Sequence, residues 1–343
     1  MVDERHTSGK REFAMADMVD SRLEEIEHWL ESLPEFRGGT LRVASADASF
    51  RRYFRLGVRE QTFVVMDAPP DKEPCEPFVR IAEKLREAGV CVPEILEQDV
   101  DRGFLILTDF GDLHYQEALS GNDRERLYDL ALAEILKLQS SLGNQLEDLG
   151  KYDEDWVRME LEIFREWCLP DMPKEEYVQT TRILVKSFLA QPAVFVHRDF
   201  HCRNLLVLED GSPGVIDFQG ALVGPITYDP VSLLRDCYVD NDEEWIRSKA
   251  LAHKQGLTMN GLLSDDLPDE NYLRWFDFTG LQRHLKCIGI FHRLSIRDGK
   301  HGYLEDVPRV LGYAVNVMRR WPELKELESM VSQARLQTSK ADL

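Results

Sequence analysis

The stretch that most constrains this chain runs from Phe195 to Gly220 and reads FVHRDFHCRNLLVLEDGSPGVIDFQG. Apolar runs at residues 193–196 and 205–208 predict two short strands, one on each side of a polar loop. The sequence EDGS at residues 209–212 predicts a hairpin turn before a further strand. The loop and the end of that further strand carry four polar side chains suited to chemistry: His197, Asp199, Asn204 and Asp217.

The spacing of these four residues fits phosphoryl transfer, which requires positioning and charge neutralisation rather than covalent chemistry. One carboxylate must orient the attacking hydroxyl, and oxygen ligands must hold Mg2+. His197-Arg198-Asp199 followed by Asn204 has the H-R-D-x-x-x-x-N spacing, and Asp217 stands where the aspartate of a D-F-G motif would fall. A lone His-Arg-Asp is usually an ordinary polar loop, but the joint spacing favours a phosphoryl-transfer site.

Composition excludes several other classes of function. The chain has 343 residues, of which 43% are hydrophobic and 30% charged, which is typical of a soluble protein with room for two lobes. The formal charge of −20 argues against a nucleic-acid partner, because binding to phosphates requires clustered Lys and Arg. Six cysteines without a C-x-x-C pair favour a reduced, cytoplasmic chain. Neither a signal peptide nor a membrane span is expected.

The first part of the chain predicts a small antiparallel β lobe at residues 17–108, after a flexible tail at residues 1–16. Its first helix is expected to end before Pro34, and a second is expected at about residues 77–88. The segments LRVAS, YFRLGV, TFVVMDA, PEILEQ and FLILTDFG are expected to be strands. Between the first two lies SADASFRR, a turn of small residues of the kind that can lie over phosphates.

Helical periodicity dominates residues 109–332, which predicts a larger, mostly helical lobe, followed by a second tail at residues 333–343. The fold class expected is therefore α+β with two lobes. Glu160 lies on one predicted helix and is a candidate substrate ligand, although a solvated face is the simpler interpretation. Asp229 is expected to cap another helix.

The order of LILTDFGD, VHRDFHCRN, VIDFQGA and YDPVSLLRD resembles the aminoglycoside phosphotransferase family, small-molecule kinases with a two-lobed protein-kinase-like fold. The resemblance extends from about Leu41 to Trp321. Within the family, VVMDAPP, VHRDFHCRN and DPVSLLRD resemble the bacterial anomeric kinases of N-acetylmuramate and N-acetylglucosamine used in cell-wall recycling. This implies ATP-dependent phosphorylation of the C1 hydroxyl of an amino sugar, to a sugar 1-phosphate that a nucleotidyltransferase could take on.

The resemblance implies a role for each residue of the central stretch. Asp199 would orient the sugar hydroxyl and accept its proton, while His197 would support the loop. Asn204 and Asp217 would hold Mg2+, and Asp229 would brace the catalytic segment.

The resemblance also implies where ATP binds. The adenine would lie behind the hinge that ends in Thr108 and Asp109, bound through backbone groups. The phosphates would be approached by four residues of the turn after the first strand: Ser49, Phe50, Arg51 and Arg52.

One departure from protein kinases concerns the third strand, which carries Met66 where a phosphate-binding Lys is expected. We expect Arg51 or Arg52 to supply the missing charge, with Glu83 on the following helix as its orienting partner. Because adjacent strand residues point to opposite faces, only one of the two arginines should do so.

The substrate stays open at the level of sequence. His201 and Gln219 are placed in the central stretch to touch it. A lactyl carboxylate would require a basic or amide contact, for which four residues are candidates: Arg235, Gln282, Arg283 and His284. An aminoglycoside or amino alcohol would instead suit the acidic stretch at residues 238–244. A nucleotide-binding pseudokinase is the other alternative, but the presence of a base and both metal ligands argues against it.

Overall fold

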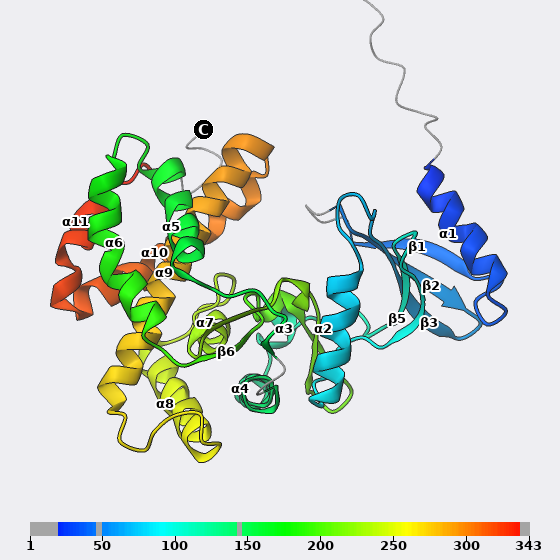
Figure 1. Ribbon diagram of the computed structural model, residues 1–343, viewed down its shortest axis with the longest axis horizontal. Coiled ribbons are helices and arrows are strands. Elements are labelled where there is room, and N and C mark those ends of the chain that lie inside the picture. Colours follow the sequence, from blue (N-terminus) through cyan, green and yellow to red (C-terminus); the bar gives the residue numbers. More distant parts are fainter. Residues whose placement is uncertain (1–19, 46–49, 143–145, 337–343) are drawn as a thin grey trace, which may run out of the picture. The chain divides into compact units, whose positions relative to one another are not determined.

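The computed structural model describes residues 20–45, 50–142 and 146–336, and its chain divides into two compact units (Figure 1). The first unit comprises Met1–Cys75 and Ile95–Asp109, and the second comprises Glu76–Glu94 and Phe110–Leu343. The sequence places the boundary near residue 108 with no insertion, whereas residues 76–94 in fact pack with the second unit. An antiparallel sheet forms the first unit and helices dominate the second, as the expected fold class requires.

The first unit is a five-stranded antiparallel sheet in the order β1-β2-β3-β5-β4. Its strands are β1 Thr40–Ser45, β2 Arg52–Val58, β3 Gln61–Asp67, β4 Ile95–Asp99 and β5 Phe104–Thr108. Pairing places Phe54 opposite Val65, and Val65 opposite Ile106. Because side chains alternate along a strand, these residues share one face, and Arg55 and Met66 lie on the other.

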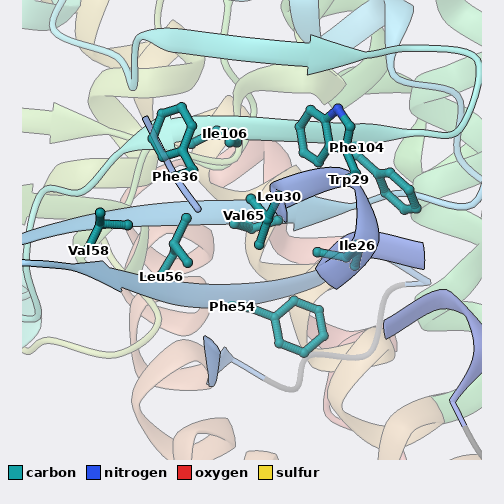
Figure 2. Close-up of a cluster of buried hydrophobic side chains, with 10 residues drawn as sticks. All are labelled: Ile26, Trp29, Leu30, Phe36, Phe54, Leu56, Val58, Val65, Phe104 and Ile106. Carbon is teal, nitrogen blue, oxygen red and sulfur yellow. The ribbon is translucent and has the colours of Figure 1, made fainter. Parts of the chain in front are cut away.

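Helix α1, Ser21–Ser32, covers the apolar face of this sheet. The helix begins after Asp20, whose Oδ1 accepts a hydrogen bond from the Leu23 amide at 3.2 Å. Figure 2 shows the resulting core, formed by Ile26, Trp29, Leu30, Phe36, Phe54, Leu56, Val58, Val65, Phe104 and Ile106. Each such side chain stabilises the unit by roughly 1.5–3 kcal/mol when it leaves water.

The second unit is built on α9, Asp269–Asp298, a helix of 30 residues that contacts most of the other long helices. The remaining α-helices described in this unit, long and short, are α2 Glu76–Glu87, α3 Tyr115–Ala118, α4 Arg124–Ser141, α5 Glu154–Cys168, α6 Lys174–Leu189, α7 Tyr228–Leu234, α8 Glu243–Met259, α10 Val307–Arg320 and α11 Lys325–Val331. The short 3-10 segments are η2 Cys202–Asn204, η3 Phe218–Gly220, η4 His301–Asp306 and η5 Pro322–Leu324. No helix in the described ranges is long and apolar enough to cross a bilayer.

Gly289 allows α9 to approach α5 closely. A Cβ atom at this position would lie 2.7 Å from the backbone nitrogen of Phe164 and 2.8 Å from its Cα. Such distances are shorter than any real carbon contact, so only glycine fits. The close approach matters because it brings the polar residues one turn earlier on both helices together.

Two small antiparallel pairs frame the central stretch. Strand β6, Ala193–Val196, pairs with β9, Leu222–Pro225, and β7, Leu205–Val207, pairs with β8, Pro213–Val215. The strand predicted after the hairpin turn, with Asp217 at its end, stops at Val215 instead, and the backbone of Asp217 turns into the left-handed region with φ of 63°. The polar loop is held between strands, as the sequence predicts.

Candidate active site

Two non-glycine residues of the central stretch have a left-handed backbone conformation: Arg198, with φ of 79°, and Asp217, with φ of 63°. Such a conformation costs roughly 1–3 kcal/mol each and persists only where the surroundings impose it. Arg198 directly precedes the predicted base Asp199, and Asp217 is itself a predicted metal ligand. The strain therefore marks the segment as one whose geometry other contacts must hold.

Asp229 supplies the first of these contacts. Its Oδ2 accepts a hydrogen bond from the amide of His197 at 2.7 Å, and its Oδ1 accepts one from the amide of Arg198 at 3.1 Å. The carboxyl is completely buried, and burial raises the pKa of Asp229 to about 7. The prediction that Asp229 caps a helix is wrong, because α7 begins at Tyr228 and Asp229 lies inside its first turn.

His197 joins the two halves of the motif. Its Nε2 lies 3.0 Å from the carbonyl oxygen of Ile216, and its Nδ1 accepts a hydrogen bond from the Asp199 amide at 3.3 Å. Burial lowers the pKa of His197 to about 4, so the ring is neutral at ordinary pH. A neutral imidazole has one donor and one acceptor, and both are used here in holding the backbone.

The half-buried carboxylate of Asp199 makes no hydrogen bond within the described part of the chain. Burial favours its neutral form, but Lys286 and other cations, including Arg283 and Arg198, outweigh this effect and lower the pKa of Asp199. An ionised carboxylate with open lone pairs can accept a hydrogen bond from a hydroxyl.

Asn204 and Asp217 lie together beside Asp199. The Asn204 amide nitrogen donates to the carbonyl oxygen of Asp199 at 3.0 Å and to Oδ2 of Asp217 at 3.3 Å. Gln219 donates to the other carboxylate oxygen of Asp217 at 2.6 Å. These contacts leave the Asn204 side-chain oxygen beside an exposed carboxylate, which is a pair of hard oxygen donors.

No group of three or more His, Cys, Asp or Glu residues is placed to hold a metal ion in the described ranges. Asn204 and Asp217 alone would offer a metal one amide oxygen and one carboxylate. This donor set fits Mg2+, which usually binds one or two carboxylates and keeps several waters.

His201 and Gln219, two of the predicted substrate contacts, each carry a buried polar atom that has no hydrogen-bond partner in the described part of the chain. These atoms are Nδ1 of His201 and Oε1 of Gln219. The His201 ring packs edge-on against Tyr238 with centroids 5.4 Å apart. Because buried polar atoms are normally hydrogen-bonded, both positions are suited to a ligand.

Glu160 is not on a solvated face, and that simpler interpretation is wrong. The residue is 2% exposed, and its carboxylate is the centre of a hydrogen-bonded network between α5 and α9. Lys286 lies 2.8 Å from Oε1, and Arg198 lies 3.3 Å from the same oxygen. The remaining donors are Tyr152, Trp156 and Gln282. Glu160 thus fixes two cations beside Asp199.

Arg235, the other predicted substrate residue, is fully buried in an ion-pair cluster. Its Nη2 lies 2.6 Å from Glu243 and 2.8 Å from Asp277. Glu243 also pairs with Arg320 at 2.6 Å. The charge of Arg235 is thus compensated within the protein, which points to a role in packing α7 against α8 and α9.

The turn after β1 is described only from residue 50 onward, so Ser49 lies outside the described residues. Phe50 is exposed, and its amide donates to Oε1 of Glu73 at 3.2 Å. Arg51 forms an ion pair with Glu73 at 3.0 Å. Both predicted phosphate contacts are thus tied to one carboxylate within the first unit.

Arg52 points to the face of the sheet that α1 covers. It donates from Nε to Oδ2 of Asp67 at 2.8 Å and also pairs with Asp20. Arg22 of α1 binds the other oxygen of the buried Asp67 at 2.8 Å. Glu83, the expected partner, is exposed on α2, and the structure gives Arg52 other carboxylates instead.

Thr108 is the last residue of β5, and Asp109 follows it; the two residues form the predicted hinge. Asp109 is held by Arg55, with Nε to Oδ2 at 2.7 Å and Nη2 to Oδ1 at 3.1 Å. Met66, at the position of the missing lysine, is completely buried on β3. The sequence analysis did not predict the contact between Arg55 and Asp109. Arg55 follows Phe54 on β2, so strand alternation alone would have placed its side chain on the face of the sheet that α1 does not cover.

A small antiparallel sheet unit, a larger helical unit and a loop that groups Asp199, Asn204 and Asp217 define a phosphotransferase with a protein-kinase-like fold. A model of the phosphotransferase enzyme family matches residues 40–259. The chain belongs to this phosphotransferase enzyme family, which confirms the resemblance seen in the sequence.

Curated relatives match nearly the whole chain. The chain is 41% identical over 333 residues to an N-acetylmuramate/N-acetylglucosamine kinase of Pseudomonas aeruginosa, covering 91% of this chain and 97% of the relative. It is 39% identical over 320 residues to a protein of the same name from Neisseria meningitidis, covering 90% and 94%.

Solved structures confirm the fold class. An ADP-bound aminoglycoside phosphotransferase superimposes with a TM-score of 0.57 at 19% identity, covering 87% of this chain and 99% of the other. The choline kinase of Streptococcus pneumoniae gives a TM-score of 0.57 at 13% identity, covering 90% and 100%.

Proposed function

We propose that the chain is an ATP-dependent kinase that phosphorylates the C1 hydroxyl of N-acetylmuramate and N-acetylglucosamine. The observation that carries this proposal is the carboxylate of Asp199, which lies beside Asn204 and Asp217, has a lowered pKa and makes no hydrogen bond to the described residues. The choice of sugar is supported by relatives about 40% identical whose names state these two substrates.

In the proposed reaction, Asp199 accepts a hydrogen bond from the C1 hydroxyl, aims its oxygen at the γ-phosphorus and takes up its proton as transfer proceeds. His197 and Asp229 fix the backbone on both sides of Arg198, so that the direction of the carboxylate is set before substrate arrives. Lys286 keeps Asp199 ionised.

We propose Asn204 and Asp217 as the protein ligands of Mg2+. When bound, the ion neutralises charge on the phosphates of ATP. The chain contributes the two oxygens and orients them, through the hydrogen bonds from the Asn204 amide and from Gln219 to Asp217. We retain Arg51 as the proposed phosphate contact and Thr108 and Asp109 as the proposed adenine contacts.

The acidic stretch at residues 238–244 offers little to a cationic aminoglycoside. Asp242 caps α8 by accepting from the amides of Glu244 and Trp245, and Glu243 is paired with Arg235 and Arg320. The stretch therefore has a structural explanation, which supports the amino-sugar substrate over the alternative.

The remaining parts of the proposal follow from the reaction. A sugar 1-phosphate is a substrate for a nucleotidyltransferase that makes nucleotide sugars, and such an enzyme would be the next partner. We propose a cytoplasmic location and a role in recycling cell-wall sugars, since the sugars and ATP would meet there.

The test is a panel of possible acceptors with ATP and Mg2+: N-acetylmuramate, N-acetylglucosamine, glucosamine and kanamycin. ATP consumption identifies the substrate, and phosphorus NMR of the product identifies the hydroxyl. We expect 1-phosphates of the two N-acetylated sugars. A 6-phosphate or a phosphorylated kanamycin would contradict the proposal, and consumption with no acceptor would indicate an ATPase.

A further inference from the structure

Two buried cations, Lys286 and Arg283, lie near the loop that carries Asp199, and the half-buried Arg198 belongs to that loop; the three differ in what balances their charge. Arg198 and Lys286 both pair with Glu160, at 3.3 and 2.8 Å. Arg283 of α9 is 3% exposed, and within the described ranges no carboxylate lies within 4.0 Å of its guanidinium. Its one hydrogen bond there runs from Nη1 to the sulfur of Cys237 at 3.4 Å.

This arrangement is costly for a protein without ligand. Burying an unpaired charge costs several kcal/mol, and a thiol is a weak acceptor that compensates little of this cost. A guanidinium binds a carboxylate through two parallel hydrogen bonds, so an anionic group on a ligand would recover the loss. Arg283 therefore has the properties of an anion-binding residue.

Contacts of the neighbouring segment place Arg283 beside the catalytic loop. Cys237 is flanked by Asp236, whose Oδ2 accepts from the Cys202 amide at 2.8 Å, and by Tyr238, whose ring contacts His201. The segment that Arg283 contacts is therefore docked on the loop of Asp199. In agreement, Arg283 is one of the cations that lower the pKa of Asp199.

The other three candidates for a carboxylate contact each have a polar partner in the described part of the chain, although Nε and Nη1 of Arg235, Oε1 of Gln282 and Nδ1 of His284 are buried there without one. Arg235 is compensated by two carboxylates, and Gln282 donates to Glu160 at 3.0 Å. The His284 Nε2 lies 3.1 Å from the Arg235 carbonyl oxygen, and burial lowers the pKa of His284 to about 3, so it carries no charge.

The two proposed substrates differ in a single group, the lactyl ether on C3 of N-acetylmuramate, which ends in a carboxylate. We propose that Arg283 binds this carboxylate and so sets the relative use of N-acetylmuramate and N-acetylglucosamine. The inference rests on the proposed function. C3 is separated from C1 by one ring carbon, so a sugar held at Asp199 presents both groups to the same site.

The test compares kcat/KM for the two sugars in the wild type, Arg283→Gln and Arg283→Lys. Arg283→Gln loses the hydrogen bonds to the carboxylate, so it should lower the ratio of kcat/KM for N-acetylmuramate over N-acetylglucosamine by about 10- to 100-fold. Arg283→Lys should recover part of the ratio through its charge. Turnover of N-acetylglucosamine reports that each variant is folded.

Arg309→Gln is the matched control. Like Arg283, Arg309 donates to Cys237, here to the carbonyl oxygen at 2.7 Å, but unlike Arg283 it forms an ion pair, with Asp306 at 2.6 Å. Its ratio should stay at the wild-type value. An equal loss for both sugars in Arg283→Gln would overturn the inference and assign Arg283 to the ionisation of Asp199 alone.

Failure of the proposed function would look different. If the wild type phosphorylated neither sugar, calorimetry of N-acetylmuramate binding would still decide the role of Arg283. Tighter binding to the wild type than to Arg283→Gln would support the carboxylate contact, and equal binding would refute it.

Discussion

The ring nitrogen Nε2 of His197 lies 3.0 Å from the carbonyl oxygen of Ile216, and this bond ties the residue before Asp217 to the loop of Asp199. The proposed base and the proposed metal ligand thus share one rigid support. Because the same ring also accepts from the Asp199 amide, a change at His197 would disturb both groups together. The individual functions are better separated by substitutions at the reacting side chains.

Asp199→Asn should lower kcat by about 100- to 10,000-fold, the range that removal of a general base produces. The amide keeps the shape of the side chain but cannot accept the proton. Nucleotide affinity, measured by calorimetry, should stay close to the wild-type value, because the proposed contact of Asp199 is with the acceptor hydroxyl and not with ATP. An active Asn variant would refute the mechanism.

Asp217→Asn should raise the Mg2+ concentration needed for half-maximal activity, since a neutral amide is a weaker ligand for a hard cation than a carboxylate. Activity is measured across a magnesium titration at saturating ATP. Asp210→Asn is the control, because Asp210 is an exposed hairpin residue bonded to Ser212. Identical titration curves for Asp217→Asn and the wild type would contradict the assignment.

Arg51→Gln and Arg52→Gln should have different effects. Arg52 pairs with the buried Asp67, so its loss should lower the free energy of unfolding by about 1–2 kcal/mol, with Arg22 still bound to Asp67. Arg51→Gln should instead raise the KM for ATP. If neither substitution, nor alanine at both positions, changed nucleotide affinity, the arginine substitute for the missing lysine would be wrong.

His253 should make stability depend on pH. Burial lowers the pKa of His253 to about 4, whereas an unfolded histidine has a pKa of about 6.5. Between these values the unfolded state binds more protons at this residue, so the contribution of His253 to the free energy of unfolding rises with pH up to about 6.5 and is constant above it.

The loss of stability from His253 reaches about 3 kcal/mol below pH 4 and is about 2 kcal/mol at pH 5, and His253→Gln should remove it. The measurement is the difference in urea midpoint between pH 5 and pH 7, with the exposed His28→Gln as control. The buried Asp229, with a pKa of about 7, acts in the opposite direction in both proteins. An unchanged difference in His253→Gln would contradict the prediction.

Gly289→Ala should destabilise the protein by about 1–3 kcal/mol, because the methyl group would meet the backbone of Phe164. It should also lower kcat, since separating α9 from α5 lengthens the contact between Lys286 and Glu160. Gly312→Ala on α10 is the control, since a Cβ there meets nothing within 4 Å. That variant should be up to about 1 kcal/mol more stable.

Local spacing was sufficient to predict the loop with Asp199 and Asn204, because the residues that define it lie within a few positions of one another. The same holds for α5 and for the strands of the first unit. The role of Glu160 could not be predicted, since periodicity does not say which helix covers a given face. Its partners Gln282 and Lys286 lie more than 120 residues further along the chain.

The contacts of Asp229 also join residues that are distant in the sequence. The position at the start of a helix suggested a cap, and the family resemblance implied that Asp229 braces the catalytic segment. Only the fold shows how it does so, because its carboxylate binds amides 31 and 32 positions earlier in the chain. The pairing of Arg55 with Asp109 spans 54 positions. Local propensity carries no information on such contacts, which depend on tertiary packing.

The insertion of α2 has a consequence for dividing the chain. The chain passes between the two units at residues 75/76, 94/95 and 109/110, so neither unit is one continuous segment. Phe78 of α2 packs on Phe218, the residue after Asp217, with ring centroids 4.7 Å apart, and Val215 donates to the Cys91 carbonyl oxygen at 2.8 Å. A fragment that starts at Phe110 would lose these supports, so exchanging lobes between relatives requires three junctions rather than one.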